Sequence, residues 1–297
     1  MAASKTPIYT AFIANVAIAA TKLVAAGFTG SSAMASEGIH SLVDSSNEVL
    51  LLLGLKRSQK PPDERRPFGY GKELYFWAFV VSLLFFALGG GVSIYEGIHH
   101  LEHPEPIKDP AWNYAVLGIA FVFDGISFIT ALREFNRQRG ATPFWKAVKQ
   151  SKDPSTFVVL FEDSADVIGI GIAFGGILLS SVLHNPYIDA VASILIGLLL
   201  TLVAVLLVRE SRSLLMGETV ARDELAEVRA LLEKHPVVSV VSSERSMYLG
   251  PEEVILILRI RFEPELIDRE LPTVINDLRD QVRKRYPHYR HLFIEPV

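Results

Sequence analysis

The chain has 297 residues, half of them hydrophobic, with a formal net charge of −4 and no cysteine. The lack of cysteine excludes disulfides, thiolate metal sites and cysteine nucleophiles, and no basic block suggests nucleic-acid binding. A mean hydropathy of +0.31 is high for a soluble protein of this length and points to a membrane protein. The first residues lack the basic start and cleavage site of a signal peptide, so we expect a retained first helix.

Six windows of mostly apolar residues are long enough to cross a bilayer, which takes roughly 20 residues of α-helix. The second and fifth windows are the most polar, but their polar residues recur at helical spacing and each window ends in an apolar run. The sequence therefore predicts six spanning helices, near Ile8–Phe28, Ala33–Leu55, Leu74–Ile98, Asn113–Leu132, Phe157–Leu183 and Tyr187–Val208.

Lysine and arginine are unevenly distributed among the connections between these windows. They gather after the second and the fourth window and at the start of the C-terminal tail, whereas the opposite connections hold almost none. By the positive-inside rule, both termini are predicted to lie in the cytoplasm.

The composition changes from about Glu218 onward. Residues 221–234 and 271–286 have apolar stripes at helical spacing, while residues 237–246, 252–262 and 291–296 are typical of strands. The order α-β-β-α-β predicts a small α+β domain with its helices on one face of the sheet. We expect a membrane all-α bundle of six helices over residues 1–212 and a cytoplasmic domain over residues 213–297.

Two of the predicted spans carry ionisable pairs at the same spacing. His40 and Asp44 lie in the second span and Glu162 and Asp166 in the fifth, each pair four residues apart and hence on one helix face. A charged residue inside a span costs roughly 2.5–3.5 kcal/mol, so such groups normally face a cavity with partners. Imidazole with carboxylates suits zinc and other first-row divalent ions. Either a metal ion or protons would relieve the repulsion among three carboxylates, which is a physical basis for exchange.

Other polar residues lie in or near the predicted spans. Lys22 in the first span could approach the group, which the sequence does not decide. The alternative interpretation is that the pairs are polar packing residues or line a water-filled network. Asp189 follows Pro186 and could simply cap a helix start. Candidates for an ion path or for supporting contacts are Glu37, Asn47, Glu48, Asp163 and Asp124.

At these residues the chain resembles the cation diffusion facilitator family of divalent metal/proton antiporters. The resemblance covers nearly the whole chain and rests on stretches such as "TGSSAMASEGIHSLVDSSNE", "RPFGYGKELYFWA", "FEDSADVIG" and "YIDAVASILIG". It implies an intramembrane site of His40, Asp44, Glu162 and Asp166, a ferredoxin-like cytoplasmic domain and a homodimer through the cytoplasmic and membrane domains. Glu162 stands where His or Asp is more usual in the family. In this respect the chain resembles the branch that includes the ninth human zinc transporter.

Two further metal sites of the family look absent from this chain. Arg66 and Tyr70 stand where histidines often occur in the loop after the second span, and the strand histidines of the tail are replaced. We therefore expect a cytoplasmic domain without a tightly bound metal, and surface roles for the histidines of the tail. The predicted outer loop holds His99, His100 and His103, which could bind metal weakly.

The sequence thus predicts a secondary transporter, not an enzyme, that exports a divalent transition metal from the cytoplasm in exchange for protons. Zinc is the first candidate for the cargo, with manganese, iron and cobalt as alternatives, and no prosthetic group is expected. The expected partners are metal ions, protons, the lipid bilayer and a second copy of the chain, without nucleic acid. The expected location is a bacterial inner membrane.

Two other functions compete with transport. A non-transporting membrane sensor or scaffold would use the same ligands as a structural metal site. An intramembrane metalloenzyme is less consistent with the sequence, because the chain lacks a His-Glu-x-x-His motif and four protein ligands would leave no open position for water.

Overall fold

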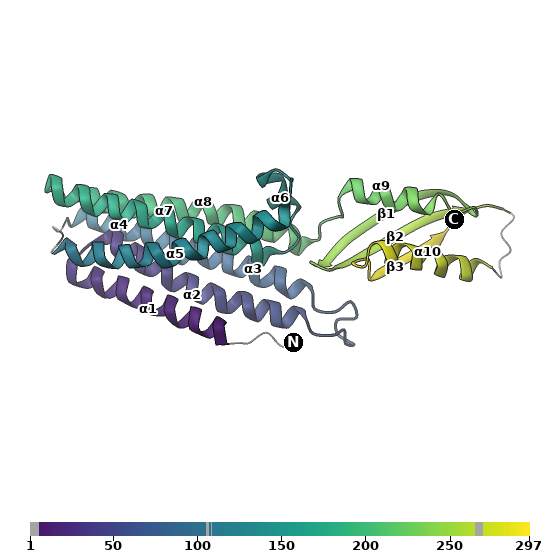
Figure 1. Ribbon diagram of the computed structural model, residues 1–297, viewed down its shortest axis with the longest axis horizontal. Helices are drawn as coiled ribbons and strands as arrows, with labels where there is room; N and C mark the ends of the chain where they lie inside the picture. The colour runs from purple at the N-terminus through teal and green to yellow at the C-terminus, as the bar shows by residue number, and fades with distance from the viewer. Residues whose placement is uncertain (1–5, 105–106, 108, 265–269) are drawn as a thin grey trace. The chain divides into compact units, whose positions relative to one another are not determined.

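The computed structural model describes residues 6–104, 107, 109–264 and 270–297, with side chains from Asn15 onward. These residues form two compact units (Figure 1). The helical unit comprises Met1–Gly54 and Phe76–Ser211, and the C-terminal unit comprises Leu55–Tyr75 and Arg212–Val297. The loop after the second predicted span therefore groups with the C-terminal unit. The functional division into residues 1–212 and 213–297 stays a prediction.

The helical unit is built from long helices. Among the described residues, four of them, including one that is continuous over Lys72–Glu102, are long and apolar enough to cross a membrane. The described part of α1 contributes a shorter apolar stretch, Asn15–Thr29, and α2 carries several charged residues. The helices are α1 Thr6–Thr29, α2 Ser32–Ser58, α3 Lys72–Leu84, α4 Val92–Glu102, α5 Pro110–Arg139, α6 Phe144–Gln150, α7 Pro154–Leu183 and α8 Tyr187–Met216, with the π-helix η1 Phe85–Gly91 between α3 and α4.

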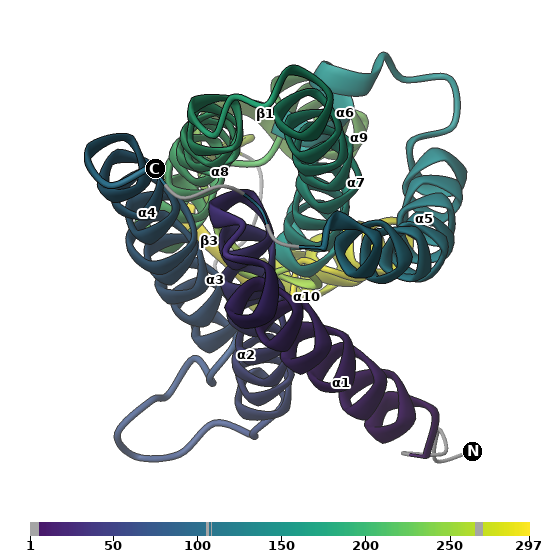
Figure 2. The same ribbon diagram turned by 90° about the vertical axis from the view of Figure 1, so that its left-hand side faces the viewer.

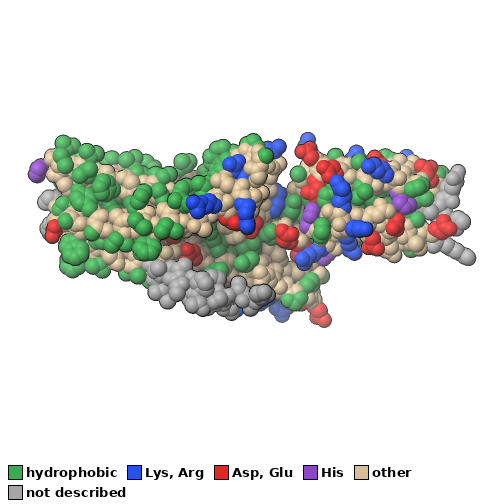
Figure 3. Space-filling view, in the orientation of Figure 1, with side chains coloured by type: hydrophobic (Ala, Val, Ile, Leu, Met, Phe, Trp, Pro, Cys, Tyr) green, Lys and Arg blue, Asp and Glu red, His purple; other side chains and the backbone are tan. Residues whose placement is uncertain are grey.

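The structure thus confirms the expectation of apolar membrane helices followed by a small C-terminal sheet, while the count of six spans stays a prediction. In the first predicted span, the side chains of residues 8–14 lie outside the described ones. The short helix α6 was not predicted from the sequence. Figure 3 shows a largely hydrophobic outer surface on the helical unit, with Lys and Arg side chains gathered near α6. A surface of this kind suits contact with lipid.

Close approaches between helices rely on glycine. Seen from one end of the bundle, α5 stands beside α7, and the α3–η1–α4 helix stands beside α8 (Figure 2). A Cβ added at Gly97 would lie 2.6 Å from Ile194 of α8, and one added at Gly197 would lie 2.6 Å from Ile94 of α4. Small residues at such crossings let two backbones pack directly against each other.

The C-terminal unit holds one three-stranded sheet and two helices. Its elements are α9 Arg222–Leu232, β1 Val238–Gly250, β2 Glu253–Phe262, α10 Leu271–Arg285 and β3 His291–Pro296. The strand order is β1-β2-β3, with β1 antiparallel and β3 parallel to β2. The element order α-β-β-α-β is the predicted one, whereas the more specific ferredoxin-like assignment stays a prediction.

The core of the C-terminal unit lies on one face of the sheet. Alternate residues of β2, namely Val254, Leu256, Leu258 and Ile260, are buried. The apolar stripes predicted for α9 and α10 supply Leu225, Val228, Leu232, Leu278 and Val282 to the buried set. On the other face, Ile257 and Phe293 are paired neighbours and both are exposed. One covered and one open face is the usual pattern of a small α+β sheet.

Within the C-terminal unit, the segment Leu55–Tyr75 groups with residues 212–297. Tyr70 donates a hydrogen bond to Asp63, and the Arg66 guanidinium lies 4.5 Å from the centre of the Tyr70 ring. The hydrogen bond from Tyr70 lowers the pKa of the Asp63 carboxyl below its ordinary value. The two residues that replace family histidines, Arg66 and Tyr70, thus contact Asp63 and each other, and Gly71 lets this segment approach the backbone of Leu249.

Candidate metal site

The second helix presents an imidazole and a carboxylate one turn apart. His40 is fully buried, and its Nδ1 lies 3.1 Å from Oδ2 of Asp44 in the next turn of α2. The ring of Phe85, the first residue of η1, meets the imidazole edge-on with ring centres 5.2 Å apart. The Phe85 ring packs against one side of the imidazole, and the two nitrogens of the imidazole face carboxylates.

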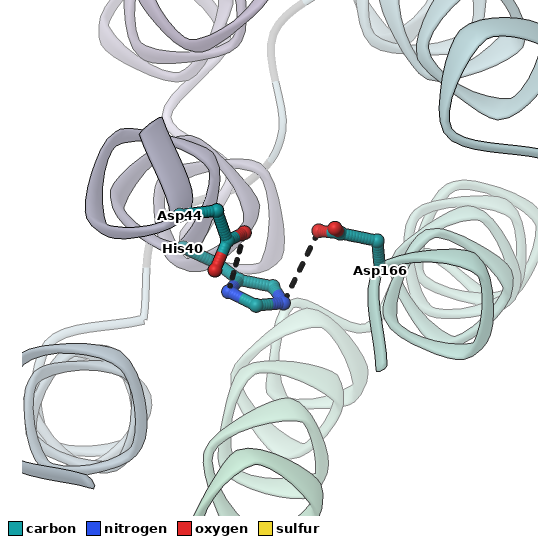
Figure 4. Close-up of side chains that lie close together, drawn as sticks. All are labelled: His40, Asp44 and Asp166. Carbon is teal, nitrogen blue, oxygen red and sulfur yellow. Dashed lines mark ion pairs between the residues drawn. The ribbon is translucent and has the colours of Figure 1, made fainter. Parts of the chain in front are cut away.

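A carboxylate from α7 completes a compact group of three. Oδ1 of Asp166 lies 3.2 Å from Nε2 of His40, so the imidazole sits between two carboxylates from different helices (Figure 4). One donor atom from each of His40, Asp44 and Asp166 lies within 4.8 Å of the other two. Zinc binds nitrogen and oxygen ligands at about 2.0–2.2 Å, and because each carboxylate faces a different ring nitrogen, a single ion bound by all three residues requires the side chains to rearrange.

Several potential metal-ligand atoms of this group make no hydrogen bond with any described residue. They are both ring nitrogens of His40, both carboxylate oxygens of Asp44 and Oδ1 of Asp166, and the two nitrogens meet these carboxylates only as ion pairs at 3.1 and 3.2 Å. Buried polar atoms in proteins are almost always satisfied, so a cluster of unsatisfied ones calls for a specific explanation, such as an ion or water. The observation favours a cation site over polar helix packing.

Glu162 lies near the group but has a different partner. It is 5% exposed, and its Oε1 accepts a hydrogen bond of 2.8 Å from Nδ2 of Asn47, three residues after Asp44 on α2. The structure therefore brings three of the four predicted ligands together and places the fourth on the wall of the same cavity. Asn47 could be suspected from its spacing to Asp44, but its pairing with Glu162 depends on how α2 and α7 meet.

Asp44 and Asp166 line an acidic cavity of about 450 Å³. Like Glu162, two more of its wall carboxylates accept from neutral donors, because Asn15 donates to Glu48 and Ser127 donates to Asp163. The carboxylates on the wall are Asp44, Glu48, Asp124, Glu162, Asp163 and Asp166. Of the predicted path residues, Glu48, Asp163 and Asp124 thus line the cavity, and a concentration of negative charge of this kind attracts cations.

A buried lysine lies next to this cavity. The side chain of Lys22 is fully buried in α1, and its Nζ lies 3.1 Å from Oε2 of Glu37 and 3.7 Å from Oδ2 of Asp124. Glu37 is also fully buried, and Gly169 of α7 leaves room for its carboxylate. Glu37 is therefore the partner of a lysine and lies outside the group of three. Sequence reasoning left the position of Lys22 open, because the contact depends on how α1, α2 and α5 pack.

The start of α2 is fixed by a carboxylate from α8. Asp189 is 2% exposed and accepts hydrogen bonds from the hydroxyl of Ser31, from the amide and hydroxyl of Ser32, and from the amide of Ala33. Asp189 does cap a helix start, but that of α2 and not that of its own helix. A carboxylate at a helix N-terminus satisfies free amides and suits the helix dipole. This cap fixes the end of α2 from which His40 follows two turns later.

The other histidines lie in smaller groups. His99 and His103 stack with ring centres 5.0 Å apart, and Nε2 of His100 lies 3.1 Å from the carbonyl oxygen of Gly30. In the C-terminal unit His235, His288 and His291 each approach a single carboxylate, those of Asp277, Glu224 and Glu253. Across the described ranges, only His40, Asp44 and Asp166 form a group of three potential ligands.

Comparison with known proteins gives consistent relatives. Residues 8–216 match the family model of the cation efflux transmembrane domain. "Proton-coupled zinc antiporter SLC30A9, mitochondrial" of Homo sapiens is 34% identical over 250 residues, covering 84% of this chain and 44% of that protein. "Metal tolerance protein C4" of Arabidopsis thaliana is 28% identical, covering 89% and 58%. "Manganese efflux system protein MneS" of Bacillus subtilis is 23% identical, covering 96% and 92%.

The chain spans less than half the length of the SLC30A9 relatives. Their names also correct one expectation from the sequence. The bacterial inner membrane is wrong as the expected location, because the relatives at 33–34% identity are named mitochondrial. The distribution of Lys and Arg orients a chain within a membrane but carries no information on which membrane it is.

The family model covers more than half of the chain and spans all four predicted ligands. Together with the SLC30A9 relatives, it confirms the resemblance drawn from stretches along nearly the whole chain. The relatives are named for antiport, metal tolerance and manganese efflux. The chain therefore belongs to the cation efflux family, whose members are transporters and not enzymes.

Proposed function

We propose that the chain is a secondary transporter that moves a divalent metal ion out of the compartment holding its termini, in exchange for protons. The observation that carries the proposal is the buried group of His40, Asp44 and Asp166, with unsatisfied donor atoms, between two helices beside an acidic cavity. An ion site within the helical bundle fits alternating access, in which helices rock around a fixed site.

The exchange follows from the chemistry of the ligands. Metal binding needs a neutral imidazole and ionised carboxylates, so the ion and protons compete for the same atoms. A metal ion entering from the cavity displaces protons, and protonation after the site opens to the other side releases the metal. Glu162 joins as a fourth ligand once its carboxylate gives up the 2.8 Å hydrogen bond that it accepts from the side chain of Asn47.

The proposed cargo is zinc first, with manganese, iron or cobalt as alternatives. One nitrogen and three carboxylate oxygens form a harder ligand set than a histidine-rich site, and harder sets favour manganese and iron more. The names of the relatives include both a zinc antiporter and a manganese efflux system. Competition for binding among zinc, manganese, iron, cobalt and cadmium would rank these ions.

The proposal extends to the architecture. We place α1 and α2 in the membrane with the four longer apolar helices, which gives six spans over residues 1–212 and both termini on one side. The polar residues of α2 suit a span because His40, Glu37 and Asn47 are fully buried inside the protein. Residues 213–297 would form a ferredoxin-like domain that dimerises together with the membrane domain. The names of the relatives support a mitochondrial membrane as the location.

Transport into sealed vesicles tests the proposal. The full chain is reconstituted into proteoliposomes, and zinc uptake is followed with and without an imposed pH gradient. We expect uptake that the gradient accelerates, and a loss of on the order of tenfold or more in Asp44→Ala, because a ligand is removed. Asp280→Ala, at an exposed acid of α10, is the matched control and should transport normally.

The outcomes separate the parts of the proposal. Undiminished uptake by Asp44→Ala would refute the site, and uptake that ignores the gradient would refute proton coupling. Metal binding that depends on Asp44 without any flux would favour a sensor or scaffold over a transporter.

A further inference from the structure

The ammonium of Lys22 is held on the same stretch of α2 that carries the metal-site histidine. Its Nζ donates a hydrogen bond of 2.8 Å to Oγ of Ser41, which directly follows His40. It donates another of 3.1 Å to Glu37, which precedes His40 by three residues. A fully buried lysine is rare and needs such partners, so the charge has a fixed position beside the site.

This ammonium also reaches the wall of the acidic cavity. Asp124, 3.7 Å from Nζ of Lys22, lines the cavity together with Asp44, Glu162 and Asp166, and so does Ser41. A divalent ion held by His40 therefore shares its surroundings with one permanent positive charge. Charges in a partly desolvated site interact over several ångströms with little screening.

Resting on the proposed transport of a divalent ion, we propose that Lys22 sets how tightly the pocket holds its cargo. Its positive charge repels the divalent ion at His40 and engages Asp124 and Glu37, so these two carboxylates do not add to the ligand set. Transport needs a site that binds strongly enough to load and weakly enough to unload. Lys22 shifts the pocket toward unloading.

The sign of the effect distinguishes this role from a structural one. If Lys22 only ties α1 to α2 and α5, its removal loosens the pocket and weakens metal binding. If it weakens binding by charge, its removal strengthens metal binding, and removal of Asp124 has the opposite effect. Removal of both charges leaves the net charge of the pocket unchanged and restores the original affinity.

Equilibrium binding of Zn²⁺ to the full chain in lipid nanodiscs tests the proposal by competition with a chelating dye. We expect the Kd of Lys22→Met to fall by roughly tenfold or more and that of Asp124→Asn to rise by a similar factor, from the Coulomb interaction of one charge with a divalent ion. The double variant should lie within about threefold of wild type, and Lys22→Arg should stay closer to wild type than Lys22→Met. Lys56→Met, at the exposed end of α2, is the matched control.

Transport by the same variants adds a second readout. Tighter binding should lower the KM of Lys22→Met for zinc and also lower its turnover, because release slows. An unchanged or higher Kd in folded Lys22→Met overturns the proposal. Should that variant not fold, an unchanged or lower Kd in Asp124→Asn overturns it instead. Absence of transport in the wild type would refute the proposed function. The proposal for Lys22 would still be tested separately, because the Kd values of the variants can be measured without transport.

Discussion

The carboxylate of Asp189 accepts four hydrogen bonds from residues at the start of α2, although it belongs to α8. Its Oδ2 lies 2.6 Å from the amide nitrogen of Ser32, and both groups are buried. Bonds to a charged group are each worth about 1.5–3 kcal/mol, and a buried amide left without a partner is penalised further. A single side chain thus fixes the first turn of the helix that carries His40 and Asp44.

We expect Asp189→Asn to lower the free energy of unfolding by about 2–4 kcal/mol, because an amide cannot accept at both positions and lacks the charge. Thermal unfolding in detergent, followed by tryptophan fluorescence of the helical unit, measures the change. Asp109→Asn is the matched control, because Asp109 precedes α5 without a side-chain cap. Equal losses in the two variants would contradict a capping role for Asp189.

The α3–η1–α4 helix and α8 touch through backbone and small side chains. A Cβ on Gly197 would lie 2.8 Å from the backbone nitrogen of Ile94 and 2.9 Å from the carbonyl oxygen of Gly90. Backbone atoms cannot turn aside as a flexible side chain can, so any larger residue must separate the helices. Phe85, which closes one side of His40, lies at the start of η1 in the same helix. The crossing therefore also supports the site.

We expect Gly197→Ala to reduce stability by about 1–3 kcal/mol, the typical effect of overpacking. Gly171→Ala in α7 is the control, because a Cβ there meets no atom within 4 Å. That variant should be neutral or slightly stabilising, since alanine is the better helix former by about 1 kcal/mol. Melting temperatures of both variants in one detergent measure the difference. If Gly197→Ala raised the melting temperature as much as Gly171→Ala, tight packing at this crossing would be contradicted.

In the molecule as a whole, the C-terminal unit has its own core and its own buried polar contacts. Nε2 of His288, just after α10, lies 2.7 Å from Oε1 of Glu224 in α9. Partial burial acts to raise the pKa of Glu224, but hydrogen bonds from His288 and Tyr289 outweigh it and lower the pKa below its ordinary value. The contact links α9 to the segment between α10 and β3.

A carboxyl with a lowered pKa stabilises the fold above its unfolded-state pKa, and the stabilisation is lost as the pH falls through the folded-state pKa. We therefore expect the C-terminal unit to lose stability below about pH 4.5, the ordinary value for glutamate. Hydrogen exchange of α9 and β2 in the full chain, corrected for intrinsic rates, measures this loss. Glu224→Gln should flatten the dependence and Glu263→Gln should not, whereas identical profiles in both would exclude Glu224 as the cause.

Features that depend on local sequence were predictable. The pairs His40–Asp44 and Glu162–Asp166 follow from helical spacing, and the apolar stripes of α9 and α10 and the strand β3 lie where the pattern places them. Contacts between distant segments were not, because no local pattern encodes them. The bonds of Lys22 to Glu37, of Asn47 to Glu162 and of Asp189 to Ser32 are of this kind. The short helix α6 was missed because its segment, which contains Lys146 and Lys149, was assigned to the connection between the fourth and fifth predicted spans.

The π-helix η1 gives this chain an unusual place for a change in length. Each hydrogen bond in a π-helix spans one residue more than in an α-helix, so η1 holds a surplus residue in the middle of a membrane helix. Because η1 accommodates that residue within one wider turn, its loss would restore a regular α-helix and leave Gly97 facing Ile194. In alignments of related chains, a one-residue gap within η1 would therefore leave this helix interface in place, whereas a one-residue gap in a regular part of the helix would turn the residues after it by about 100°.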